Sequence, residues 1–409
     1  MTPMMTIDGA RLLKDLRELA GFGSFGTGVD RPAFSDADMA ARRWVCDRLA
    51  QAGLDAAIDN VGNVLGRADA DRAVLIGSHT DTVPKGGWLD GALGVVYGIE
   101  IARTVRQADI AAGAGGTGVD VISFQEEEGA FLPLMGSRAF CGEVSGAEFD
   151  AASNGEGRGL RQAIADWGLD GNPPARVDAK RHTAYLEAHI EQGPRLEAAD
   201  LKIGVVTGLV GIRRFRINCA GQADHAGTTP MDMRRDAGAA LVRLATALLD
   251  MFEAEAAPET VWNIGQVTFR PGAFNVVPEA AELLVEFRDT SPDRLVRLGD
   301  SLAAVVAAAD GASNVAVTAV DAGGIAPAQL DQRLQAAITA AAADCGAPSV
   351  ALQSGAGHDA MVLSKHVPAA MMFIPSIGGR SHHVAENTSD DDIVLGCRVL
   401  ARAVETLIT

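Results

Sequence analysis

Short apolar runs that end in histidine or carboxylate residues constrain the fold of this chain more than any other feature. The run Ala73–Ile76 leads into Gly77-Ser78-His79-Thr80-Asp81, and Asp90-Gly91 follows shortly after. A continuous apolar run of this length is typical of a strand that is buried on both faces of a parallel sheet. Ligands in open α/β sheets collect beyond the carboxyl ends of such strands. The run therefore predicts an α/β sheet with His79 at its ligand-binding edge.

Three later segments repeat the pattern. Val119–Phe124 leads into Gln125–Gly129, which contains three consecutive glutamates, and Thr183–His189 ends in histidine. The run Ala369–Ile374 precedes Ser381-His382-His383. One glutamate could bind a metal while its neighbour acts as a base. Mixed imidazole and carboxylate ligands favour zinc, manganese, cobalt or nickel over calcium.

Composition narrows the classes of function. A chain of 409 residues with 48% apolar side chains can form two domains or one domain with an insertion. Its formal charge of −18 argues against partners such as nucleic acid or anionic membranes. The five cysteines are odd in number and unpaired in spacing, which favours a reducing compartment. Since neither an export signal nor a membrane-spanning run is indicated, we expect a cytoplasmic protein.

The order of the predicted elements indicates an inserted domain. Ser35 is a predicted helix N-cap, and strands and helices alternate from there to about residue 210, as in α/β proteins. Residues 212–325 instead read as strand, helix, two strands, helix and strand, the ferredoxin-like order. We therefore predict a catalytic metal-binding domain over residues 1–211 and 326–409, interrupted by a second domain over residues 212–325.

Five strings together resemble a known family over essentially the whole chain. They resemble the hydantoinase/carbamoylase branch of the aminoacylase and carboxypeptidase G-like metallohydrolases. Members remove carbamoyl or ureido groups, as N-carbamoyl-L-amino acid hydrolases, β-ureidopropionases, allantoate amidohydrolases and ureidoglycolate hydrolases do. The resemblance implies an α/β catalytic domain with a central mixed sheet and an inserted ferredoxin-like lid that also dimerises. The strings are His79-Thr80-Asp81 with Asp90, Glu127-Glu128-Gly129, His189–Pro194, Ala223–Met231 and Ser381-His382.

The resemblance implies a binuclear metal centre with two divalent ions per subunit. His79 and His189 would bind one ion, Glu128 and His382 the other, and Asp90 would bridge them. A bridging carboxylate holds two ions roughly 3.5–4 Å apart, as in two-metal hydrolases. The residue types leave the metal open among zinc, manganese, cobalt and nickel.

The resemblance also assigns catalytic roles around these ligands. Glu127 would be the general base, and Asp81 would orient the imidazole two residues before it. We expect Glu126 to be a solvated acid or an outer support of the site. His383 is an alternative to His382 as the ligand.

The remaining matches concern the substrate. His225 would stabilise the oxyanion, reaching across from the partner subunit of a homodimer. Arg288 would clamp a carboxylate through paired hydrogen bonds. Further matched substrate positions are Gln192, Asn275 and His358.

Three of these residues have a structural alternative. Arg288 could instead pair with Asp289 or Glu286 on a sheet surface. Asn275 could be an ordinary turn residue, and His358 could have a capping or structural role.

One departure from the family pattern concerns the pocket wall. The segment Gly129–Ser137 is shorter than in family members and lacks the arginine that usually precedes the phenylalanine. The metal ligands are untouched, but the choice of substrate is affected.

We hypothesise a hydrolase that cleaves the carbamoyl C–N bond of a small N-carbamoyl or ureido acid and releases ammonia and carbon dioxide. N-carbamoyl-L-amino acids, allantoate and β-ureidopropionate are the candidates. One alternative is an aminoacylase or dipeptidase with the same metals. The other is a non-catalytic, metal-stabilised oligomeric scaffold, against which the base beside a ligand argues.

Overall fold

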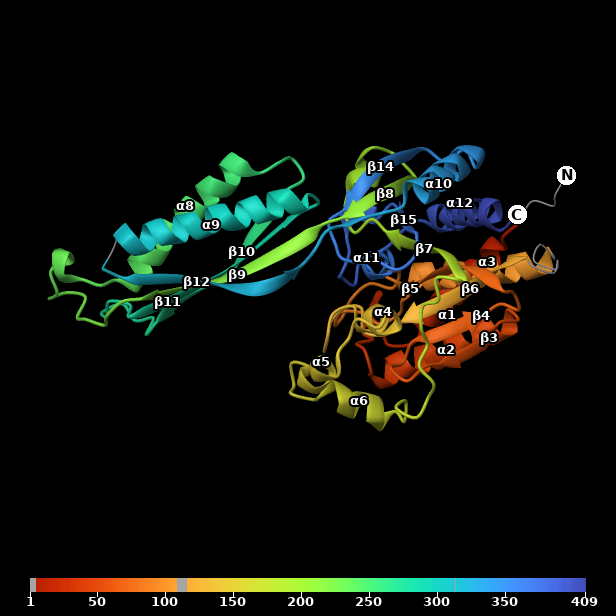
Figure 1. Cartoon of the computed structure of the whole chain (residues 1–409), viewed down its shortest axis with the longest axis horizontal. Coiled ribbons are helices and arrows are strands. Elements are labelled where there is room, and N and C mark those ends of the chain that lie inside the picture. The colour runs from red at the N-terminus through yellow and green to blue at the C-terminus, as the bar shows by residue number, and fades with distance from the viewer. Residues whose placement is uncertain (1–4, 109–115, 313) are drawn as a thin grey trace. The chain divides into compact units, whose positions relative to one another are not determined.

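The structure is a computed structural model that describes residues 5–108, 116–312 and 314–409. The chain divides into two compact units (Figure 1). Unit 1 comprises residues Met1–Thr207, Gln329–Ser354 and His358–Thr409, within the described ranges. Unit 2 comprises Gly208–Ala328 together with Gly355–Gly357.

A mixed sheet forms the centre of unit 1. Its strands run in the order β13-β8-β15-β7-β5-β6-β4-β3, and β14 pairs with β8. The four central strands β15, β7, β5 and β6 are parallel, and the pairs β8–β15, β4–β6 and β3–β4 are antiparallel. The predicted α/β fold with a central mixed sheet is therefore confirmed. The bounds are β3 Asp55–Ile58, β4 Val64–Arg67, β5 Arg72–His79, β6 Thr117–Phe124, β7 His182–Ile190, β8 Ile203–Leu209, β13 Ala328–Gln329, β14 Ser349–Ser354 and β15 Ala369–Ile374.

Strand β5 shows why these apolar runs form the sheet centre. Every residue from Ala73 to His79 is buried, so both faces of the strand are covered, as its unbroken apolar pattern predicts. Burial of each large aliphatic side chain contributes about 1.5–3 kcal/mol. A short ribbon of β1 Ser24–Phe25 and β2 Gly28–Val29 lies apart from this sheet.

Helices cover the sheet of unit 1. Ser35 caps α2 by accepting a hydrogen bond from the backbone N–H of Asp38, which confirms the predicted N-cap. Helices α1, α2, α3, α10 and α12 share one hydrophobic core with β5 and β7. The bounds are α1 Gly9–Ala20, α2 Asp36–Gln51, α3 Ala92–Gln107, α4 Met135–Phe140, α5 Gly146–Ala151, α6 Leu160–Asp166, α7 Arg195–Ala198, α10 Gln332–Asp344, α11 Asp359–Leu363 and α12 Asp390–Ile408, with a 3-10 turn at Ile377–Gly379.

Unit 2 is an antiparallel sheet with two long helices. The sheet order is β10-β11-β9-β12, and α8 and α9 pack on it. Along β11, side chains from Ala281 to Phe287 alternate between buried and half-buried. The second face carries charged pairs such as Arg214–Glu286, so one face packs while the other meets solvent. The bounds are β9 Gly211–Ala220, α8 Ala237–Glu255, β10 Val261–Arg270, β11 Ala280–Asp289, α9 Pro292–Ala312 and β12 Ala316–Ile325, with a 3-10 turn at Met231–Met233.

Among the described residues, no helix combines the length and the hydropathy needed to cross a bilayer.

Candidate metal centre

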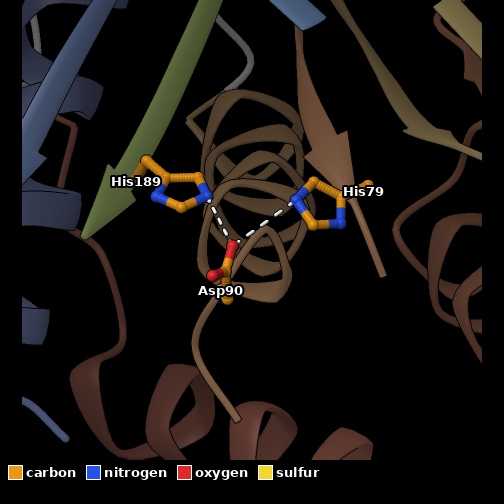
Figure 2. A group of neighbouring side chains, drawn as sticks. All are labelled: His79, Asp90 and His189. Atoms are coloured by element: carbon orange, nitrogen blue, oxygen red, sulfur yellow. Dashed lines mark ion pairs between the residues drawn. The ribbon is translucent and has the colours of Figure 1, made fainter. Parts of the chain in front are cut away.

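Two histidines and one aspartate converge at the carboxyl edge of the parallel strands in unit 1 (Figure 2). His79 is the last residue of β5, His189 is near the end of β7, and Asp90 lies just before α3. Asp90 Oδ1 is 3.0 Å from His189 Nε2 and 3.6 Å from His79 Nε2. One donor atom from each residue lies within 4.8 Å of the others, so the three can hold one ion.

A second group of donors shares Asp90 with the first. Asp90 Oδ2 lies 3.3 Å from His382 Nε2, which in turn is 3.6 Å from Glu128 Oε2. Glu127 Oε2 is 3.6 Å from His79 Nε2, and both residues form a third group with Glu128. The two oxygens of Asp90 therefore face two different sets of donors.

Strand register explains why segments far apart in sequence meet here. In the parallel pair β5–β6, His79 is opposite Phe124. The glutamate segment, Gln125–Gly129, therefore leaves the sheet beside His79. In the parallel pair β15–β7, His189 is opposite Phe373. Gly91 lies against the His79 ring, and a larger residue does not fit there, because its Cβ atom would lie 2.4 Å from the ring. Its φ of +64° also favours glycine.

Backbone carbonyls orient both buried histidines. His79 Nδ1 is 3.0 Å from the carbonyl oxygen of Asp81, and His189 Nδ1 is 2.9 Å from that of Ile190. A proton on Nδ1 satisfies each carbonyl and leaves the Nε2 lone pair facing the carboxylates. Asp81 thus orients His79 mainly through its backbone, since its carboxylate is 3.8 Å away. That carboxylate instead accepts a hydrogen bond from the backbone N–H of Glu128, at 3.2 Å.

Hydrogen bonds with Ser381, Gln192 and Glu386 support Asp90. Asp90 Oδ2 accepts hydrogen bonds from Ser381 Oγ at 2.9 Å and from Gln192 Nε2 at 3.0 Å. The buried Glu386 accepts from the backbone N–H groups of Leu89 and Asp90, both at 3.0 Å. Gln192, a predicted substrate residue, therefore contacts a predicted metal ligand. No local pattern identifies Glu386, since its partners are 296 and 297 residues away in sequence.

Of the two roles expected for Glu126, a solvated acid and an outer support of the site, the structure agrees with the second. It is fully buried, with a φ of +61° that turns its side chain into the protein. Its carboxylate accepts hydrogen bonds from the backbone N–H groups of Phe131 and Leu132 in the shortened segment. Burial, followed by the charge of Asp81, raises the pKa of Glu126 to about 8. Glu126 thus organises the loop that carries Glu127 and Glu128.

Three further histidines have distinct surroundings. His382, rather than His383, lies in the donor cluster, since the exposed His383 accepts a hydrogen bond from the backbone N–H of Ala385. His358 is buried, with its ring centroid 4.6 Å from that of His189. Its Nε2 is 3.1 Å from Ser354 Oγ, and its side chain makes no cap hydrogen bond to α11. Burial, followed by the charge of His189, keeps the pKa of His358 well below its usual value.

Unit 2 brings two of its predicted substrate residues together and keeps the third apart. The backbone of His225 pairs with Val276, and the N–H of Ala226 donates to the carbonyl of Asn275 at 3.0 Å. His225 and Asn275 are both exposed. Arg288 is near the opposite end of β11, a ten-residue strand that spans about 30 Å at roughly 3.3 Å per residue.

Arg288 pairs with Glu286, one of the two structural partners that the sequence offered. Its Nε lies 2.7 Å from Glu286 Oε1, and its Nη1 donates to the carbonyl of Gly355 at 2.9 Å.

Residues 75–406 match the model of the family described as peptidase family M20/M25/M40. The chain belongs to this family. It is 34% identical to an N-carbamoyl-L-amino-acid amidohydrolase of Paenarthrobacter aurescens, over 97% of each chain. It is 31% identical to the allantoate amidohydrolase of Bacillus subtilis, over 93% of each chain. A hydantoinase/carbamoylase family amidase from Burkholderia phymatum superposes with a TM-score of 0.91 at 45% identity, covering 99% of this chain and 98% of that one. The resemblance predicted from the sequence is confirmed.

Hydrolases of the M20 family are metal-dependent, and the charges of this centre fit a cation. Burial, followed by the charge of Asp90, raises the pKa of Glu128 to about 7, and one of its oxygens is buried without a hydrogen-bond partner. Burial likewise raises the pKa of Glu127 well above its usual value, although the charge of His79 opposes this. The hydrogen bond to Asp90 raises the pKa of His382 to about 9. Carboxylates crowded in this way need a positive partner, and their oxygens with three imidazole nitrogens are ligands that transition metals prefer.

Proposed function

We propose that this M20 hydrolase is a binuclear metal-dependent amidohydrolase that cleaves the carbamoyl C–N bond of a small N-carbamoyl amino acid or ureido acid. The observation that carries the binuclear site is the position of Asp90. Its Oδ1 faces His79 and His189, while its Oδ2 faces His382. The reaction class is supported by the relatives, which include N-carbamoyl-L-amino-acid and allantoate amidohydrolases. The products would be ammonia, carbon dioxide and the amine.

The residues suit two ions that share one carboxylate. His79 and His189 would hold the first ion, Glu128 and His382 the second, with Asp90 between them. Bound ions of this kind polarise a carbonyl and lower the pKa of water to about 7. The ions are zinc, manganese, cobalt or nickel in this proposal.

Glu127 is the proposed general base. Its carboxylate is largely buried, 3.6 Å from His79 Nε2, and does not complete either of the two groups that contain Asp90. One Oε atom would accept a proton from the attacking water and pass it to the nitrogen that leaves when the carbamoyl C–N bond breaks. A carboxyl group whose environment raises its pKa can both hold and release a proton near neutral pH.

Unit 2 is the proposed lid and dimerisation domain, with a ferredoxin-like order of elements. Its edge strand β10 leaves Val261, Val267 and Phe269 exposed, and such an edge is a template for pairing with a second chain. Because His225 and Asn275 lie at the opposite end of β11 from Arg288, we assign them to the site of the partner subunit. There His225 would donate to the developing oxyanion.

Arg288 would bind the carboxylate of the substrate. It is already paired with Glu286, so a substrate carboxylate would compete for the same guanidinium. Its other contact, Gly355, is three residues before His358 in the chain, another proposed substrate residue. Gln192 would contact the substrate from beside Asp90.

The proposed location is the cytoplasm. All five cysteines are free thiols, as expected in a reducing compartment.

A substrate panel tests the reaction. Metal-free protein is reloaded separately with manganese, zinc, cobalt or nickel. Ammonia release is measured on N-carbamoyl-L-amino acids, N-carbamoyl-β-alanine, allantoate and ureidoglycolate, and amine release on N-acetyl-amino acids and dipeptides. Metal-dependent ammonia release supports the proposal. Amine release from acyl or peptide substrates alone would identify an aminoacylase or dipeptidase. Inactivity with every metal and substrate would favour the scaffold, although the names of the relatives favour neither alternative.

A further inference from the structure

Helix α2 carries a fully buried pair of opposite charges next to the metal centre. Asp38 and Arg42 are one helical turn apart, and neither side chain is exposed. Asp38 Oδ1 lies 3.0 Å from Arg42 Nε. We refer to these two residues as the α2 clamp. Burial of two charges is costly, so their other contacts indicate what the pair does.

Arg42 holds the carboxyl end of β6. Its Nη2 donates to the carbonyl oxygen of Phe124 at 3.0 Å, and its Nη1 donates to those of Gly62 at 3.2 Å and Ser123 at 3.4 Å. The same Nη2 lies 3.5 Å from Asp81 Oδ1. One guanidinium therefore contacts both β6 and the segment after His79, and its rigid fork of donors suits such a junction.

The contacts continue to the residues that carry the chemistry. The second oxygen of Asp81 accepts from the backbone N–H of Glu128 at 3.2 Å. Asp38 Oδ2 accepts from Gln125 Nε2 at 2.8 Å. The α2 clamp therefore holds both ends of the glutamate segment. It contacts Gln125 directly and Glu128 through Asp81.

We propose that the α2 clamp is a positioning device that sets Glu127 and Glu128 relative to His79, with Arg42 as its central residue. This inference rests on the proposed metal-binding function. Arg42 touches neither the proposed ions nor the substrate. It acts by fixing the backbone that presents one half of the donor set, and outer partners of metal ligands typically contribute about 10–100-fold to metal affinity.

The test is the Mn²⁺ affinity of the metal-free full-length protein, measured by competition with a chelator. Arg42→Met should weaken binding about tenfold or more. Arg42→Lys keeps the charge but cannot reach all the carbonyls, so its affinity should fall between those of wild type and Arg42→Met. Wild-type affinity in Arg42→Met would overturn the proposal.

Arg181, the residue before β7, provides a matched control, because it also contacts β6. It is also buried, pairs with Asp120 at 2.7 Å and 2.8 Å, and donates to the carbonyl of Ala68 at 2.7 Å. Asp120 is four residues before Phe124 on β6, away from the carboxyl edge. Arg181→Met should lower the melting temperature while Mn²⁺ affinity stays at the wild-type value. An equal loss of affinity in both variants would show that general destabilisation, and not positioning, is responsible.

A double variant separates positioning from folding. Asp38→Asn with Arg42→Met removes both buried charges, so the melting temperature should recover relative to Arg42→Met alone. Mn²⁺ affinity should stay weak, because the contacts to Phe124 and Asp81 are still missing. Recovery of affinity together with stability would overturn the proposal. If wild type bound none of Mn²⁺, Zn²⁺, Co²⁺ and Ni²⁺, the proposed function itself would fail, and this inference with it.

Discussion

Replacement of Gly91 by alanine should damage the metal centre without touching any proposed ligand. Gly91 precedes α3 with a φ of +64°, and its N–H donates to His189 Nε2 at 3.1 Å. A Cβ atom at this position would lie 2.4 Å from the Nε2 and Cδ2 atoms of His79.

The structure sets the size of the effect. Carbon atoms in contact stay about 3.5 Å apart, so the His79 ring must move by about 1.1 Å or the chain before α3 must shift. Metal–ligand distances tolerate only about 0.2 Å. We therefore expect metal affinity to fall about tenfold or more. The left-handed backbone adds roughly 1–2 kcal/mol of lost folding stability.

Metal affinity by chelator competition and the melting temperature of the metal-free protein measure the two effects. Gly26→Ala is the control, because Gly26 has a φ of +59° but nothing within 4 Å of its Cβ position. Both variants should lose stability, and Gly91→Ala alone should lose metal affinity. Unchanged affinity in Gly91→Ala would refute the assignment of His79 as a ligand.

Three other variants have defined outcomes. Glu127→Gln should lower kcat about 10²–10⁴-fold while metal content stays normal, and retained turnover would remove Glu127 as the base. Burial, followed by the charge of Glu187, raises the pKa of Asp359 to about 8, so the folded protein binds this proton more tightly than the unfolded chain does. The stability of the metal-free protein should then fall as pH rises from about 4 to about 8. Asp359→Asn should flatten this dependence in thermal unfolding, and an unchanged slope would contradict the shift. Arg288→Lys should raise KM for carboxylate substrates about tenfold with little change in kcat. An unchanged KM would leave Arg288 as a sheet residue paired with Glu286.

The parts of the fold that the sequence predicts are those set by short-range patterns. The apolar run before His79 predicts a doubly buried strand, and β5 is such a strand, with His79 as its last residue. The alternative partner of Arg288 was also foreseeable, because Glu286 is only two residues away on the same strand.

The remaining features depend on contacts between distant segments. The sequence leaves Glu126 open between a solvated acid and an outer support of the site, and only the folded chain decides. Its positive φ turns the carboxylate into the core, where it binds the backbone of the loop. Arg42 reads as an ordinary helix residue. Its partner carbonyl on Phe124 is 82 residues away, and only the pairing of strands brings the two together. Glu386 accepts a hydrogen bond from the backbone N–H of Asp90 although the two are 296 residues apart, so they meet only when nearly the whole of unit 1 has folded.

The number of metal ions that activity requires tests the central proposal most directly. Metal-free protein is titrated with Mn²⁺ while ammonia release from an N-carbamoyl-L-amino acid is followed. If Asp90 joins two sites, activity should reach its maximum at two equivalents per chain. Saturation at one equivalent would contradict the shared site, and release of ammonia without added metal would contradict the metal-dependent mechanism as a whole.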